Sequence, residues 1–249
     1  MNDLLNILLQ KKKLLDSFRP LPPALVNNLE EWFRIELTYN SNAIEGNTLT
    51  RSETAIVVEK GLTIGGKPLK DHLEAINLAH AIDYIKSLVS LKKTDITLQT
   101  ILDLHSIILR GIQPEDAGKW RRIAVRISGS PVQLTEPLKV LELMEEFISW
   151  LHATNENDIA VAADAHLKFV TIHPFVDGNG RTARLLMNLI LMQSGYPPAI
   201  IEQEKRAQYI GAIEKAQLTH NLNEFHQFIY KSVEKSLDIY IDSAQKTIS

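Results

Sequence analysis

The chain has 249 residues, of which 45% are apolar and 23% charged, with a net charge of −3 and no cysteine. At about 100–200 residues per domain, this length excludes a short peptide module. Because the net charge is slightly negative, the chain lacks the positive field that attracts proteins to nucleic acid, so no nucleic acid partner is expected. The lack of cysteine excludes disulfides, thiolate metal sites and a cysteine nucleophile, and the expected location is a reducing cytoplasm.

Apolar residues recur at helical spacing along most of the chain, and this pattern predicts an all-α protein. Clusters of glycine and proline bound the expected helices. These lie near residues 3–17, 23–39, 50–60, 69–90, 95–110, 138–153, 157–171, 181–194, 204–217 and 222–245. We expect three parts, an N-terminal helical region (1–90), a core (91–220) and a C-terminal helix (221–249). No apolar run reaches the roughly 20 residues of a membrane span, so no membrane partner is expected.

The segment from Gly61 to Pro68 carries the glycines and the lysine of a phosphate-binding P-loop. Pro68 replaces the hydroxyl residue that binds Mg²⁺ in such loops, and no alternation of strands and helices provides the parallel sheet that they require. A turn between two helices is therefore the better interpretation.

One segment departs from helical spacing. Between Trp120 and Ile127, charged and β-branched residues alternate loosely before the sequence Ser-Gly-Ser-Pro. Alternation with a period of two is typical of strands. Residues 119–130, called the flap segment below, are therefore expected to form a short β-hairpin.

The helix expected over 181–194 has almost no polar face, because apolar residues follow one another from Leu185 to Met192 with the single interruption of Asn188. Such a helix is typical of the middle of a helical fold. The residues at its start should therefore be held by the best-packed element of the chain.

Residues 173–184, called the motif loop below, read HPFVDGNGRTAR and form the densest group of chemically capable side chains. Gly178 and Gly180 let successive backbone N–H groups turn toward one anion, and the positive end of the following helix adds to this attraction. Arg181 and Arg184 are three residues apart, so they share a helix face and can hold separate phosphate oxygens. The motif loop therefore predicts a phosphate site.

Two more residues of the motif loop suit phosphate chemistry. Asp177 offers the oxygen ligand that Mg²⁺ prefers when phosphates and waters complete its coordination. His173 can accept a proton near neutral pH. The alternative is an ordinary helix start, in which Asp177 caps the helix, Asn179 makes a local turn and the arginines are solvated. The six features together favour the phosphate site.

The motif loop resembles the HPFx(D/E)GN(G/K)RxxR signature of the Fic-domain family at every specified position. The likeness reaches back to about Leu21, and the sequence LLMNLILMQSGYPP is similar to animal members of the endoplasmic reticulum. The family has an all-α core with a β-hairpin flap, and its usual activity is transfer of AMP from ATP to a hydroxyl group of a target protein. The resemblance implies this fold, this activity and the cofactors ATP and Mg²⁺, with Mn²⁺ as a substitute.

The resemblance also implies individual roles. His173 is the general base and Asp177 the metal ligand, with Asn179 and Arg181 completing the catalytic group. The α- and β-phosphates lie in a cradle of Gly178, Asn179 and Gly180, Arg181 stabilises the transferring phosphate charge, and Arg184 holds the γ-phosphate. Tyr209 and Ile210 border the adenine, and Ile127, Ser128, Gly129 and Ser130 lie at the edge of the flap that faces the nucleotide. Gln217 replaces an asparagine that lies near the adenine in the animal relatives.

A second match lies far upstream. The sequence SNAIEGN over 41–47 resembles the (S/T)xxxE(G/N) inhibitory motif of some Fic proteins, with Ser41, Glu45 and Gly46 at its specified positions. On this interpretation Glu45 ends a short helix, forms a bidentate ion pair with Arg184 and occupies the space of the γ-phosphate. ATP then binds with its α-phosphate misaligned, and a misplacement of about 1 Å can lower a rate roughly 100-fold.

The resulting hypothesis is a protein adenylyltransferase that uses MgATP, modifies a Ser, Thr or Tyr hydroxyl and is inhibited by Glu45. Its target is expected to dock along residues 121–127 of the flap segment by adding a strand. Two alternatives stay open, a phosphodiesterase that uses Glu45 to remove AMP from a modified target, and a helical adaptor that only senses nucleotide. A homodimer, the target and the signal that displaces Glu45 are also left open. The other histidines are expected to be surface or core groups.

Overall fold

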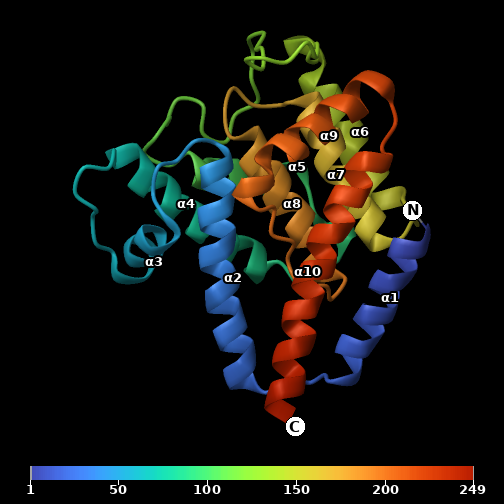
Figure 1. The fold of residues 1–249 in the computed structure, drawn as a ribbon. Helices are drawn as coiled ribbons and strands as arrows, with labels where there is room; N and C mark the ends of the chain where they lie inside the picture. The colour runs from blue at the N-terminus through green and yellow to red at the C-terminus, as the bar shows by residue number, and fades with distance from the viewer. Residues whose placement is uncertain (1, 249) are drawn as a thin grey trace.

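The computed structural model describes residues 2–248, and every regular element in that range is a helix (Figure 1). The α-helices are α1 (Asn2–Ser17), α2 (Pro23–Ile44), α3 (Arg51–Lys60), α4 (Leu69–Ser87), α5 (Leu98–Ile108), α6 (Val140–Ala153), α7 (Asp158–Ile172), α8 (Asn179–Gln193), α9 (Arg206–Thr219) and α10 (Asn223–Ile248). Short 3-10 helices η1 (Lys93–Asp95), η2 (Pro137–Lys139) and η3 (Gln203–Lys205) precede α5, α6 and α9. The predicted all-helical class is confirmed.

Helix α8 lies in the middle of the molecule (Figure 1). Twelve of its fifteen residues are buried, so it has no solvent face, as its sequence predicts. It packs against α7 most extensively and also contacts α2, α4 and α5. The start of α8, where the motif loop ends, is therefore fixed by the centre of the hydrophobic core.

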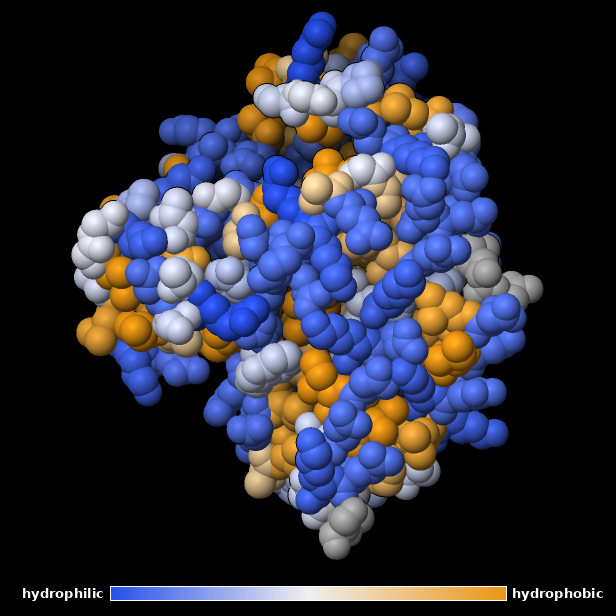
Figure 2. Space-filling view, in the orientation of Figure 1, coloured by the Kyte–Doolittle hydropathy of each residue, from blue (hydrophilic) through white to orange (hydrophobic). Residues whose placement is uncertain are grey.

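Helices α2 and α10 run side by side through the lower half of the molecule, and α1 packs along α10 (Figure 1). Figure 2 shows apolar side chains on the lower half of this face, over α2 and α10. A cleft of about 790 Å³ lies between α2, α4 and residues 195–198, and its lining includes Phe33, Leu37, Tyr196 and Tyr240. No residue of the motif loop lines this cleft.

Local signals explain several helix ends. The hydroxyl of Thr50 and the carboxylate of Glu53 form a capping box at the start of α3, and Gly61 ends that helix in the left-handed conformation at φ 64°. Residues 61–68 then form a turn that leads directly into α4. The interpretation of this glycine-rich segment as a turn between helices is confirmed.

Helix α2 continues five residues beyond the expected end at 39, to Ile44. Its last turn contains Asn40, Ser41 and Asn42, which are weak helix formers. Tertiary contacts outweigh this preference, because all three are buried, and Asn40 accepts a hydrogen bond from the Gln203 N–H at 2.9 Å. Glu45 therefore ends a 22-residue helix, and the expected separate short helix over 41–47 is wrong.

The expected β-hairpin of the flap segment is also wrong, because no strand occurs between residues 119 and 130. The buried Arg121 explains how the segment is held instead. Its guanidinium donates hydrogen bonds to the carbonyl oxygens of Ile123 and Thr135. The Arg121 side chain therefore holds the start of the flap segment next to the chain that follows it, where a hairpin would use hydrogen bonds between two backbone strands. The segment is an irregular loop at one end of the molecule.

Among residues 2–248, no helix has the length and apolar character needed to cross a bilayer.

Candidate active site

His173 follows the last residue of α7 in the left-handed conformation, at φ 53°. Residues other than glycine rarely adopt this conformation, and they do so mostly where surrounding contacts impose it. Nδ1 of His173 lies 3.3 Å from the carbonyl oxygen of Val170, which only accepts, so Nδ1 carries the proton and Nε2 keeps a free lone pair. Burial lowers the pKa of His173 below its ordinary value. His173 is thus neutral at pH 7 and can accept a proton at Nε2.

The Asn179 side chain holds the motif loop in shape. Its amide oxygen accepts from the N–H of Phe175 and its amide nitrogen donates to the carbonyl of the same residue, both at 2.9 Å. Both residues are buried. The side chain of Asn179 is therefore committed to the loop, which leaves its backbone N–H for a ligand.

The Phe175 ring lies between two other aromatic rings. His105 of α5 stacks on it with parallel rings and centroids 3.5 Å apart, and Trp120 of the flap segment stacks at 5.0 Å. Such contacts add to the apolar area that the rings bury. The motif loop is thereby joined to α5 and to the flap segment.

His105 also fixes the turn at Gly178. Its Nε2 donates to the Asp177 carbonyl at 3.0 Å and its Nδ1 accepts from the N–H of Gly118 at 3.0 Å, so the ring is neutral. Burial lowers its pKa to about 4. A Cβ on Gly178 would lie 3.2 Å from this ring, and Gly178 has φ 79°, so only glycine fits here.

The start of α8 can bind an anion. Gly178 is its N-cap residue, and no side chain caps the helix. The N–H groups of the first residues of a helix have no partner within it, and the positive end of the helix dipole is located there. The N-terminus of α8 thus has the arrangement that binds phosphate groups in other proteins.

Glu45 lies against this helix start. A Cβ on Gly180 would be 2.5 Å from Oε1 of Glu45, so the carboxylate contacts the first turn of α8. The same oxygen accepts a hydrogen bond from Nη2 of Arg184 at 2.6 Å. The structure therefore places an anionic group of the chain itself at the N-terminus of α8.

Arg184 is held by α2 as well as by Glu45. Its Nε donates to the Ser41 hydroxyl at 2.8 Å and its Nη2 donates to the Ser41 carbonyl at 2.9 Å. The ion pair with Glu45 thus uses one carboxylate oxygen, in place of the expected bidentate arrangement, and Ser41 takes Nε and the second N–H of Nη2. Gly46, at φ 97°, turns the chain immediately after Glu45.

Tyr209 supports Arg184 from α9. Its hydroxyl is 2.7 Å from Nε2 of the buried His166 and interacts with the Arg184 guanidinium. Burial raises the pKa of Tyr209 and lowers that of His166 to about 3, so both are neutral at pH 7. Tyr209, expected beside adenine, is only 1% exposed and acts on Arg184, whereas its neighbour Ile210 is 40% exposed.

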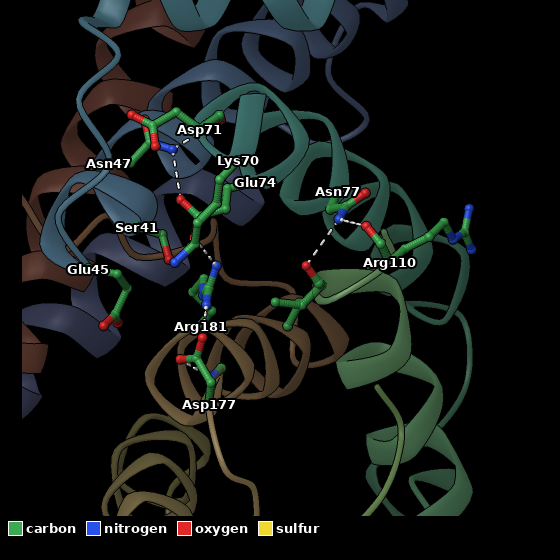
Figure 3. Close-up of polar contacts among 12 residues, drawn as sticks. Ser41, Glu45, Asn47, Lys70, Asp71, Glu74, Asn77, Arg110, Asp177 and Arg181 are labelled. Atoms are coloured by element: carbon green, nitrogen blue, oxygen red, sulfur yellow. Dashed lines mark hydrogen bonds and ion pairs between the residues drawn. The ribbon is translucent and has the colours of Figure 1, made fainter. Parts of the chain in front are cut away.

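Arg181 is buried between two carboxylates (Figure 3). Its Nη1 lies 3.0 Å from Oε1 of Glu74 in α4, and its Nη2 lies 3.3 Å from Oδ2 of Asp177. Asp177 is 40% exposed, and its Oδ1 accepts from the N–H of Gly178 at 2.6 Å. Between residues 2 and 248 there is no group of three or more acidic or histidine side chains that could hold a metal ion by itself.

The flap segment approaches α9 beside these residues. Its turn over 127–130 contains Gly129 at φ 80°, and the Ser130 hydroxyl donates to Oε2 of Glu214 at 2.6 Å. Gln217, further along α9, donates to the Thr171 hydroxyl at 3.2 Å. Ser130 thus joins the turn over 127–130, expected at the nucleotide edge of the flap, to α9, the helix that also carries Ile210.

Four residues of this site have no counterpart in the motifs: Glu74, His105, Arg121 and His166. Arg121 donates from Nε to the His173 carbonyl at 2.7 Å, which ties the flap segment to the motif loop. All four are buried polar residues on other parts of the chain, and an unusual charge or imidazole in an apolar stretch was the only available signal.

The fold and site together define an all-helical protein in which the uncapped start of α8 lies beside Glu45 and Arg184, close to a neutral histidine. The Fic/DOC family model matches residues 95–191. The protein adenylyltransferase Fic of Drosophila melanogaster is 39% identical over 82% of this chain, and the protein adenylyltransferase fic-1 of Caenorhabditis briggsae is 40% identical over 85%. The chain spans 41% and 42% of the lengths of these two relatives.

Two solved structures share the fold. Fic-1 from Caenorhabditis elegans is 34% identical with a TM-score of 0.89, and the match covers 100% of this chain and 74% of that one. A Fic domain-containing signaling protein from Bacteroides thetaiotaomicron is 27% identical with a TM-score of 0.86, covering 96% of this chain and 98% of that one. The chain belongs to the Fic/DOC family.

Proposed function

We propose that this protein is an adenylyltransferase that transfers AMP from ATP to a hydroxyl group of a target protein. The observation that carries the proposal is the uncapped start of α8, which lies beside Arg184 and next to a histidine with a free Nε2. The names of the relatives, protein adenylyltransferases, support the same reaction. The proposed location is the cytoplasm, on the sequence grounds given above.

In the proposed reaction the target hydroxyl gives its proton to Nε2 of His173 as its oxygen attacks the α-phosphorus of ATP. The bond from that phosphorus to the bridging oxygen breaks, and pyrophosphate leaves. The N–H groups at the start of α8 and the guanidinium of Arg181 lie where they can stabilise the negative charge. This arrangement assigns proton transfer to His173 and charge stabilisation to the helix start and Arg181.

The residues present fit a magnesium ion that is bound together with ATP. Asp177 is the one partly exposed carboxylate in the motif loop, and Mg²⁺ typically takes one or two carboxylates, with substrate phosphates and waters as its other ligands. When bound, the ion would neutralise phosphate charge. Asp177 would hold it, with Mn²⁺ as a substitute.

We infer that Glu45 inhibits the reaction. Its carboxylate contacts Gly180 and pairs with Arg184, so it takes the position and the cation that a phosphate of ATP would need. If Glu45 is displaced, the buried guanidinium of Arg184 loses its ion pair. Because an unpaired buried charge is unfavourable, Arg184 would then bind another anion. ATP binding in the productive position and the Glu45 contact therefore exclude one another.

The flap segment is the proposed docking site for the target, along residues 121–127. Ile123 is 59% exposed, and residues 121–127 form no strand or helix. An extended peptide can bind such a segment by backbone hydrogen bonds. The absence of a hairpin changes the sequence-based expectation, because the target would pair with a single irregular edge.

Removal of AMP is a second candidate activity, because Glu45 lies where it could act on water. Its side chain is 36% exposed, and Oε1 takes the bond from Arg184 while the carboxylate interacts electrostatically with His173. A carboxylate in this position can accept a proton from a water that attacks the phosphorus of an AMP-modified target.

The test is incubation with ATP labelled at the α-phosphate, together with cell lysate, for the native chain and for Glu45→Gly. The variant should incorporate about 10–100-fold more label, which follows from restored alignment of the α-phosphate. Mass spectrometry then identifies the added group and the modified hydroxyl. The double variant Glu45→Gly, His173→Ala is the control for labelling that does not depend on the site.

Tight nucleotide binding without labelling in any variant would favour the nucleotide-sensing adaptor. Labelled protein that loses its label on addition of native chain, and keeps it on addition of Glu45→Gly, would show AMP removal by Glu45. Equal labelling by the native chain and Glu45→Gly would contradict inhibition by Glu45.

A further inference from the structure

The carboxylate of Glu74 connects two parts of the site that are far apart in the sequence (Figure 3). Glu74 lies in α4, outside the motif loop and outside the 41–47 motif, and its side chain is 6% exposed. Oε1 accepts from Nη1 of Arg181 at 3.0 Å, and Oε2 accepts from Nδ2 of Asn47 at 2.9 Å. One buried carboxylate is therefore shared between the motif loop and the chain that follows Glu45.

The Asn47 side chain is fixed in the orientation that serves Glu74. Its Oδ1 accepts from the N–H of Leu49 at 3.0 Å, so its Nδ2 faces α4, where it donates to Glu74 and also to the Asp71 carbonyl at 3.0 Å. Its backbone N–H donates to the Asn42 carbonyl at the end of α2. Asn47 thus follows any movement of residues 45–48, called the Glu45 turn below.

Arg181 depends on Glu74 for its orientation. Its contact with Asp177 is longer, at 3.3 Å, and Asp177 is 40% exposed, where water competes for the carboxylate. Nε of Arg181 is buried and has no hydrogen-bond partner between residues 2 and 248. Lys70 approaches Glu74 at 3.7 Å but is itself 57% exposed, so it cannot replace Arg181 as the partner of the carboxylate.

We propose that Glu74 is a positioning residue for AMP transfer, which orients Arg181 and couples it, through Asn47, to the Glu45 turn. This inference rests on the proposed function. When Glu45 leaves the start of α8, the Asn47 amide moves with the turn. Glu74 then loses its hydrogen bond from Asn47 and keeps its contact with Arg181. Release of inhibition and final placement of Arg181 are thereby linked.

Helix α4 provides a matched control. Asp71, nearly one turn earlier on α4, is also buried and binds the same turn, accepting from the N–H and the hydroxyl of Thr48 at 2.8 and 2.6 Å. Asp71 forms no contact with Arg181. If Glu74 only holds the turn, Glu74→Gln and Asp71→Asn should lower the rate of AMP transfer equally. If Glu74 positions Arg181, only Glu74→Gln should lower this rate.

The kinetic test uses the Glu45→Gly chain, in which transfer is measurable. Glu74→Gln keeps the size of the side chain and loses its charge, so we expect kcat to fall at least about tenfold while KM for ATP changes less than about threefold, because Arg181 acts on charge that develops in the transition state. Asp71→Asn should change both constants by less than about twofold. Circular dichroism and thermal unfolding establish that each variant is folded.

The second measurement does not need activity. The Nε–H signal of Arg181 in a ¹⁵N-labelled chain, assigned by its loss in Arg181→Lys, reports the order of the guanidinium. Glu74→Gln should shift or broaden it, and Asp71→Asn should not. A change in this signal in chains that all fail to transfer AMP would refute the proposed function and leave the role of Glu74 in orienting Arg181 standing.

The inference is overturned if Glu74→Gln leaves the Arg181 signal as it was, or if it changes the signal of an active chain while kcat stays the same. Equal losses of kcat in Glu74→Gln and Asp71→Asn would also overturn it, because they would show a general role in holding the Glu45 turn.

Discussion

The motif loop and the flap segment lie side by side and are held in opposite ways. The motif loop is fixed from several directions, since Asn179 binds Phe175, His105 of α5 binds Asp177, and buried α8 follows directly. The flap segment is joined to the rest of the chain mainly through Trp120, Arg121 and Ser130. One region has redundant contacts, and the other depends on a few.

This difference matches what each region has to do under the proposed function. A base and phosphate-binding groups must be in place before the substrate arrives, because reorganisation during the reaction raises the barrier. A docking segment instead leaves its backbone groups free for the partner chain. The contrast predicts that changes in the motif loop affect chemistry or global stability, and that changes in the flap segment act locally.

The largest expected effect belongs to His173→Ala. Transfer should fall about 10²–10⁴-fold, the usual contribution of a general base, because no other neutral imidazole has a free Nε2 beside the start of α8 in the described chain. ATP affinity, measured by calorimetry, should change little, since His173 forms no part of the helix start that binds the phosphates. Turnover above a tenth of that of the Glu45→Gly parent would remove His173 as the base.

The structure of the motif loop itself is tested by Asn179→Ala. The change leaves the N–H and the carbonyl of Phe175 without partners in a buried position, and at about 1–3 kcal/mol for each group the free energy of unfolding should fall by about 3 kcal/mol. Urea unfolding measures the loss. Asn221→Ala is the matched control, because Asn221 makes a similar turn contact with the Asn223 N–H at an exposed site, and its loss should cost less than about 1 kcal/mol.

A smaller effect is expected from acid. The folded chain holds His105 neutral with a pKa of about 4, whereas a histidine in the unfolded chain titrates near 6.5. Between these values the unfolded state binds more protons, so stability is complete above about pH 6.5 and falls as the pH is lowered, by about 2 kcal/mol at pH 5. Buried His166, with a pKa of about 3, acts in the same direction.

Unfolding free energies at pH 8 and pH 5 measure this loss. His105→Gln should reduce the difference by about 2 kcal/mol. His80→Gln, at an exposed position of α4, should leave the difference unchanged. An identical acid response in both variants would show that His105 is not the group that titrates.

The sequence predicted the features that are encoded locally. Periodicity with glycine and proline breaks located the ten α-helices found between residues 2 and 248. The concentration of titratable and charged residues in the motif loop, together with the 41–47 motif, pointed to residues that the fold brings together at the start of α8. Helical periodicity is a strong signal because burial of one face requires it. The end of α2 was misjudged because contacts with distant chain, from Gln203 and Arg184, stabilise weak helix formers.

The supporting residues could not be predicted. Glu74 and His105 lie 107 and 72 positions from their partners Arg181 and Asp177, so no local spacing links them. The flap segment has the alternation of a strand, but a strand forms only where a partner satisfies its backbone groups, and here the Arg121 side chain takes that role. Alternation alone does not show which partner is present.

The smallest effect on stability is expected from Arg121→Lys, which tests the flap side of the comparison. Lysine keeps the charge and loses the fork of donors that reaches His173, Ile123 and Thr135. Ile123 is exposed, and Thr135 and His173 are half-buried, so water can bind the three freed carbonyl groups, and the free energy of unfolding should fall by less than about 1 kcal/mol. The segment itself should lose its order, which limited digestion with trypsin detects as faster cleavage at Arg122 and Arg126.

The matched control is Arg122→Lys, which keeps a trypsin site on an exposed residue of the same segment and should digest like the native chain. Under the proposed function, Arg121→Lys should also lower labelling of a target more than it lowers ATP affinity, because the docking segment is disturbed while the start of α8 is intact. Loss of global stability comparable to that of Asn179→Ala would contradict the comparison, since it would show that the flap segment is as firmly integrated into the fold as the motif loop.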